Sequence, residues 1–181
     1  MCNQYTHQQI CLMNRIRQLW GQHVYWTRFF IISTASNLRD LEPVTKRLLR
    51  NPKDFAELLA PTFGMKAACR FEELLTQHLM IGADLVNAAK NCEADKANTA
   101  RNKWYKNADE IAEFLSSINR CWNKSKWKNM LYSHLEMTEK EATLRLQGNF
   151  TADICMFDNI ENEAFKMADY MFCGMVKTHN R

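Results

Sequence analysis

The chain has 181 residues, 46% of them hydrophobic and 24% charged, which fits a single globular domain, residues 1–181, with a sizeable core. Only five glycines and three prolines are present, so the composition argues against a turn-rich β fold and favours helices. The net charge of +4 is small and argues against a nucleic-acid partner, so the lysines and tryptophans that alternate in residues 103–106 and 122–128 are better interpreted as solvated helix faces.

Apolar residues spaced three and four positions apart predict a first long helix over residues 8–36. The pattern breaks over residues 37–63, where Pro43 and Pro52 suit the first turns of two short helices and Asn51 would cap the second. We expect this connection to cross one end of the bundle that the long helices form.

The same spacing predicts further long helices over residues 65–91, 95–119, 126–146 and 151–177. Asn123 or Ser125 can cap the helix that ends before Gly148, and Gly148 is a fitting stop for it. No segment shows the alternation of a strand. The sequence therefore predicts an all-α, up-and-down helical bundle of four to five long helices, with a short-helix insertion after the first.

Three of the five histidines lie in similar short phrases, each in the middle of a predicted long helix. These phrases are Leu19-Trp-Gly-Gln-His23-Val, Leu74-Leu-Thr-Gln-His78-Leu and Leu131-Tyr-Ser-His134-Leu. Each histidine falls on the apolar face of its helix, and the midpoints of antiparallel helices lie at the same height in a bundle. We therefore expect the three imidazoles to converge in the core. Asn107, Thr27 and Thr138 are further polar residues near the same level.

The last predicted helix carries Asp158 and Glu161 on a face that is otherwise apolar, and residues three apart share a helix face. Three imidazoles with one or two carboxylates would suit a divalent transition metal such as Zn, Fe, Mn or Ni, with one position open to water or a small-molecule ligand. The carboxylates would either bind the ion or orient the histidines. Such a site would serve a metal-dependent hydrolase, transferase or oxidase, whose substrate the sequence does not name.

The sequence leaves other interpretations open. A histidine on an apolar helix face is commonly a core residue that hydrogen-bonds a neighbouring polar group, and the site could instead hold another cofactor. The bundle would then bind a partner or a small ligand without catalysis. The helix motifs Glu-x-x-His, His-Glu-x-x-His and His-x-x-x-His, which identify known metal sites, are absent.

Two resemblances bear on the fold. Three histidines on separate helices are similar to the DinB-like metal-binding bundles in architecture and ligand type, although the paired histidine spacing of that family is missing. The phrases Leu19-Trp-Gly-Gln-His-Val-Tyr-Trp-Thr-Arg28, Asn107-Ala-Asp-Glu-Ile-Ala-Glu-Phe-Leu-Ser-Ser-Ile-Asn119 and Ala168-Asp-Tyr-Met171 resemble an uncharacterised helical family of spore-forming Firmicutes, a bacterial phylum. That resemblance covers most of the chain after Leu12 and implies a helical fold. Some members carry the label acetylglutamate kinase, but this chain has no glycine-rich phosphate loop.

The seven cysteines form no Cys-x-x-Cys pair and no regular framework, and their number is odd. Dispersed thiols without a leader segment predict a cytoplasmic protein without disulfides. The longest apolar run, Phe29-Phe-Ile-Ile32, is far too short to cross a membrane. The sequence does not decide whether the protein forms an oligomer.

Overall fold

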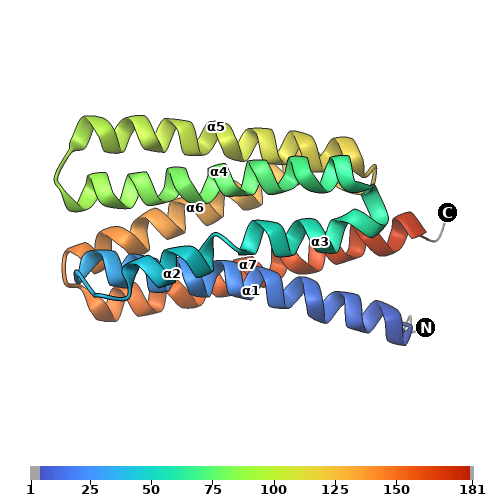
Figure 1. Cartoon of the computed structure of the whole chain (residues 1–181), viewed down its shortest axis with the longest axis horizontal. Coiled ribbons are helices and arrows are strands. Elements are labelled where there is room, and N and C mark those ends of the chain that lie inside the picture. The colour runs from blue at the N-terminus through green and yellow to red at the C-terminus, as the bar shows by residue number, and fades with distance from the viewer. Residues whose placement is uncertain (1–4, 180–181) are drawn as a thin grey trace.

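The computed structural model describes residues 5–179, and this part of the chain forms helices and no strand. Its seven helices are α1 (His7–Ala35), α2 (Leu41–Leu48), α3 (Asn51–Phe63), α4 (Met65–Lys90), α5 (Ala94–Ile118), α6 (Lys124–Leu146) and α7 (Phe150–His179). The long helices α1, α4, α5, α6 and α7 run up and down along one axis (Figure 1). The predicted all-α class and up-and-down packing are confirmed.

The connection after α1 differs from the prediction. It does not cross one end of the bundle, because α2 and α3 follow each other along the bundle axis and return antiparallel to α1 (Figure 1). Helix α2 packs on α1, and α3 packs mainly on α4. Both short helices have a fully buried apolar face, which includes Leu48 of α2 and Phe55 and Leu59 of α3. The two short helices predicted for this connection are therefore present, but they pack lengthwise against the long helices instead of crossing one end of the bundle.

Local signals in the sequence set the helix ends. Thr6 and Gln9 form a reciprocal capping box at the start of α1, and the Asn123 side chain accepts a hydrogen bond from the backbone N–H of Lys126 at the start of α6. Gly64 separates α3 from α4 with a φ of 83°, a conformation that disfavours residues with a Cβ. Gly148 ends α6 in the same left-handed region, as predicted.

The buried hydrophobic side chains form two clusters rather than one continuous core. The larger cluster fills most of the bundle and contains large side chains such as Phe55, Phe71 and Trp127. The smaller cluster lies where α1, α2, α4 and α6 meet, and it consists of Phe30, Ile31, Val44, Leu48, Leu79, Val86 and Ala142. This division matters because the cavity described below is lined by residues of both clusters.

A buried ion cluster joins α1, α6 and α7. Arg28 Nη1 lies 2.5 Å from Glu141 Oε1 and 2.6 Å from Asp153 Oδ1, and Arg145 Nη1 lies 3.3 Å from Asp153 Oδ2. The Glu141 and Asp153 side chains are almost completely buried. Burial raises the pKa of Glu141 to about 7, although Arg28 acts in the opposite direction.

None of the helices in the described part of the chain has the length and hydropathy that a membrane span requires. The six cysteines within residues 5–179 are free thiols, and Cys2 lies outside the described residues.

Candidate metal centre

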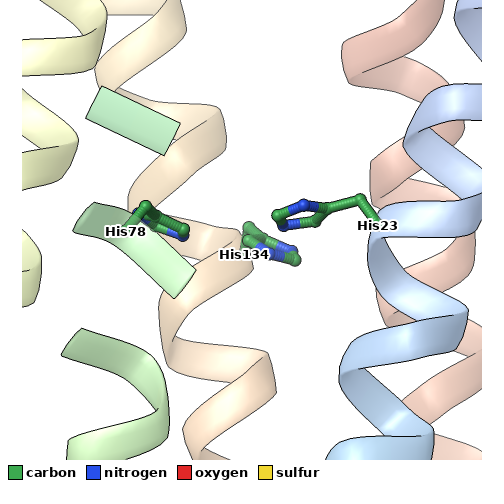
Figure 2. Close-up of side chains that lie close together, drawn as sticks. All are labelled: His23, His78 and His134. Atoms are coloured by element: carbon green, nitrogen blue, oxygen red, sulfur yellow. The ribbon is translucent and has the colours of Figure 1, made fainter. Parts of the chain in front are cut away.

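Three histidines from three different helices meet in the interior of the bundle. His23 of α1, His78 of α4 and His134 of α6 are each only 2% exposed. Their ring centroids are separated by 6.1 Å (His23–His78), 5.6 Å (His23–His134) and 6.4 Å (His78–His134), so they form a nearly equilateral triangle. Figure 2 shows the three rings extending toward a common centre, and one nitrogen from each ring lies within 4.8 Å of the others. The predicted convergence is confirmed.

The His23 ring is held by Asn51, the first residue of α3. His23 Nδ1 lies 3.2 Å from Asn51 Oδ1, and Asn51 Nδ2 donates to the backbone carbonyl of Leu19 over 3.0 Å. Because the amide nitrogen faces a carbonyl, Oδ1 must face the ring, and an amide oxygen can only accept. Nδ1 of His23 therefore carries the ring proton, and Nε2 keeps a free lone pair.

The His78 ring is held in the same way by Asn107 of α5. His78 Nδ1 donates to Asn107 Oδ1 over 2.9 Å, and Asn107 Nδ2 donates to the carbonyl of Leu74 over 3.1 Å. Leu74 precedes His78 by four residues, as Leu19 precedes His23. Two histidine–asparagine units of the same design thus present the lone pair of Nε2, which makes no hydrogen bond among the described residues. Such a partner on the far ring nitrogen is common for metal-binding histidines.

The third ring lacks an equivalent partner. Nδ1 of His134 is buried and makes no hydrogen bond to the described part of the protein. The Thr138 hydroxyl, one turn further along α6, donates to the His134 carbonyl over 2.8 Å, and Thr27 makes the equivalent bond to the His23 carbonyl. A buried imidazole with unpaired nitrogens is costly in a protein interior. This cost would be offset if a bound ion accepted a lone pair from the ring.

The electrostatic environment keeps all three rings neutral. Burial lowers the pKa of His23 to about 4, although the hydrogen bond from Nδ1 to Asn51 acts in the opposite direction. Burial and the neighbouring His23 lower the pKa of His78 to about 3, and burial with both neighbours lowers the pKa of His134 well below its usual value. Neutral imidazoles are the form that binds metal ions.

A cavity of about 100 Å³ adjoins the three histidines, which all contribute to its lining. Most of its wall is apolar and comes from the smaller hydrophobic cluster, including Phe30, Leu48, Leu79 and Val86. Three neutral nitrogen ligands and an adjoining cavity are the arrangement that open metal sites share, since the remaining coordination position stays accessible.

Four further residues shape this cavity. Arg101 and Glu139 form a partly exposed ion pair in its lining, with Arg101 Nε donating to Glu139 Oε1 over 2.8 Å. The Trp104 ring lies beside His78, with the centroids 5.3 Å apart, and its buried Nε1–H has no acceptor within the described protein. Gly82 on α4 allows this contact, because a Cβ there would lie only 3.1 Å from the indole.

The structure does not bring Asp158 and Glu161 to the histidines. Asp158 is exposed, and Glu161 is half-buried and accepts a hydrogen bond from the Tyr25 hydroxyl over 2.6 Å. The expected apolar face of α7 was wrong in its first half, because Ile154 is 54% exposed while the charged Asp153 is fully buried. The buried face therefore runs through Asp153 and Ile160, and the two carboxylates point elsewhere.

The sequence did not predict the role of Asn51. Its position before Pro52 suggested a helix cap, but Asn51 is already the first residue of α3 and its side chain is 0% exposed. Its contact with a helix 28 residues earlier depends on how α3 packs. No protein-family model, curated protein or solved structure matches the chain, so the function is inferred from this geometry.

Proposed function

We propose that the protein binds one divalent transition-metal ion through His23, His78 and His134, with a fourth coordination position that opens into the cavity. The observation that carries this proposal is the convergence of three buried, neutral imidazoles whose potential ligand nitrogens lie within 4.8 Å of one another. An ion with three protein ligands and one open position can activate a bound water or polarise a small ligand.

The spacing requires only a small contraction on binding. Metal–nitrogen distances of about 2.0–2.1 Å place the nitrogens of a tetrahedral site about 3.3 Å apart. Rotations of the side chains at χ1 and χ2 would close a gap from at most 4.8 Å to that value. The asparagine partners of His23 and His78 already orient two of the rings.

The ligand set narrows the choice of metal. Without Asp158 and Glu161, the site offers three imidazole nitrogens and no carboxylate among the described residues. Imidazole ligands suit Zn²⁺, Fe²⁺ and Ni²⁺, whereas Mn²⁺ favours oxygen ligands. We therefore favour Zn²⁺, Fe²⁺ or Ni²⁺ as the resident ion.

A purely structural role for the three histidines agrees less well with the hydrogen bonds that they make. A core histidine normally satisfies its nitrogens with hydrogen bonds, because an unpaired buried polar group costs about 1–3 kcal/mol. Here Nε2 of His23 and of His78 makes no hydrogen bond in the described protein, and Nδ1 of His134 has none either. Only Nδ1 of His134 among these nitrogens is completely buried, and a common ligand would give the three rings the partner that the described residues do not supply.

Elemental analysis of tag-free protein tests the proposal. We expect about one transition-metal ion per chain after purification or after anaerobic loading of the stripped protein with Zn²⁺, Fe²⁺ or Ni²⁺. His78→Ala and His134→Ala should each lose the ion, whereas His7→Ala should keep it, because His7 is exposed at the start of α1. Wild-type protein that retains no ion after loading would overturn the proposal, as would equal metal content in all three variants.

A further inference from the structure

We infer that the ligand at the open coordination position is a small carboxylate with a short hydrocarbon chain. This inference rests on the proposed metal site and names the class of molecule that the adjoining cavity accepts. The carboxylate would bind the ion, and the hydrocarbon chain would lie against the smaller hydrophobic cluster.

Charge is the first argument. Three neutral imidazoles leave the full double charge of the ion in a buried place, and an uncompensated buried charge is strongly unfavourable. Among the described residues that line the cavity, Glu139 is the only acid, and Arg101 already neutralises it. An anion that enters from outside would therefore complete the site better than a neutral molecule.

The second argument is an unpaired donor. Trp104 lines the cavity beside His78 and is 5% exposed, and its Nε1–H has no acceptor among the described residues. Trp20 and Trp127 also have unpaired indole N–H groups, but neither lines this cavity. A carboxylate bound to the ion has a second oxygen, which can accept the hydrogen bond from Trp104.

Shape and polarity supply the third argument. The wall away from the histidines is formed by side chains such as Phe30, Leu79, Val86 and Ala142, which offer no hydrogen bonds. The volume of about 100 Å³ is somewhat less than the roughly 150 Å³ of an apolar cavity that holds benzene. It fits a chain of about three to five carbons.

The test uses the full chain loaded with Co²⁺, whose visible spectrum reports changes at the open coordination position. Butyrate is titrated and compared with acetate, butan-1-ol and butylamine. We expect butyrate to change the spectrum and to bind about fifteenfold more tightly than acetate, because each of its two additional buried CH₂ groups contributes about fourfold. The alcohol and the amine should leave the spectrum unchanged.

Two variants test the residues that the inference uses. Trp104→Phe removes the N–H and keeps an aromatic ring, so it should weaken butyrate and acetate binding about tenfold each. Trp127→Phe is the control, since this indole is also buried and unpaired but lies outside the cavity lining, and this variant should bind both carboxylates as the wild type does. Ala142→Leu would fill the apolar wall and should remove the advantage of butyrate while acetate still binds.

The outcomes separate the two proposals. If the stripped protein takes up neither Co²⁺ nor Zn²⁺, Fe²⁺ or Ni²⁺, the metal site itself is refuted, and the inference fails with it. If Co²⁺ binds but no carboxylate alters the spectrum, or if butyrate binds no better than acetate, the metal site stands and the carboxylate inference is overturned. An equal response to butan-1-ol would also overturn it, because charge would then not select the ligand.

Discussion

Acid should destabilise the metal-free protein through its three buried imidazoles. Their pKa values in the folded chain are about 4 for His23, about 3 for His78 and far below the usual value for His134, mainly because of burial. An imidazole in the unfolded chain has a pKa of about 6.5, so below that pH the unfolded chain binds protons that the folded chain does not. The stability that depends on the neutral rings is complete above pH 6.5 and is lost as the pH falls.

The magnitude follows from these values. A pH of 5 is about 1.5 units below the pKa of an imidazole in the unfolded chain. Each ring therefore lowers the free energy of unfolding by about 2 kcal/mol, or about 6 kcal/mol for three. Glu141 acts in the opposite direction: its pKa of about 7 in the folded chain lies above its ordinary value, so protonation between pH 8 and 5 adds about 2–3 kcal/mol of stability. The effect of the histidines is larger, so the free energy of unfolding falls by about 3–4 kcal/mol between pH 8 and 5. This is a large fraction of the free energy of unfolding of a typical domain, which is only about 5–15 kcal/mol.

Urea denaturation in the presence of a chelator, at pH 8, 6 and 5, measures this loss. The Glu141→Gln variant isolates the histidines, because its side chain does not titrate, and we expect it to lose about 6 kcal/mol between pH 8 and 5. The wild type should lose about half of that. A free energy of unfolding that stays constant over this range in Glu141→Gln would refute the assignment of three neutral buried rings.

Two further predictions concern single substitutions. Asn107→Ala removes the acceptor that orients His78, so the affinity for Zn²⁺, measured by competition with a chromophoric chelator, should fall about 10–100-fold. Leu115→Ala, two turns further along α5, is the control, and it should destabilise the fold by about 2–5 kcal/mol without changing the affinity for Zn²⁺. An equal loss of Zn²⁺ affinity in both variants would contradict a positioning role for Asn107. Gly174→Ala would place a Cβ on the indole of Trp122, so we expect a loss of about 1–3 kcal/mol in thermal or urea unfolding with unchanged metal content. Wild-type stability in that variant would show that Trp122 can move aside.

The sequence located the three histidines because two simple patterns agree. Each lies on the apolar face of its helix, and each lies near the middle of a long helix, as in α1, α4 and α6. Helices of similar length that lie side by side in a bundle have their midpoints at about the same height, and α1, α4 and α6 run in the same direction (Figure 1). Position along the helix and direction around it were therefore enough to predict that His23, His78 and His134 meet.

The same reasoning failed where polar and apolar residues exchange their usual places. In α7 the exposed Ile154 and the buried Asp153 reverse the normal pattern, because Arg28 and Arg145 hold the Asp153 carboxylate in the interior. Hydrophobic periodicity cannot foresee an aspartate that is buried by ion pairs from other helices. The orientation chosen for α7 was therefore wrong in its first half, and it placed Asp158 and Glu161 on the inner face.

The position of His134 suggests what the ion would do for the fold. Helix α6 packs mainly on α5 and α7 and contacts α1 and α4 only lightly, yet His134 meets His23 and His78 of those two helices. The other two rings are already tied to α3 and α5 by their asparagine partners, whereas His134 has no such tie. A bound ion would thus stabilise the position of α6 more than that of the other helices, because it would link His134 to α1 and α4 across the centre of the bundle. Removal of the ion should accelerate amide hydrogen exchange in the middle of α6 more than in α1 or α4, and a uniform acceleration across the helices would contradict this bracing role.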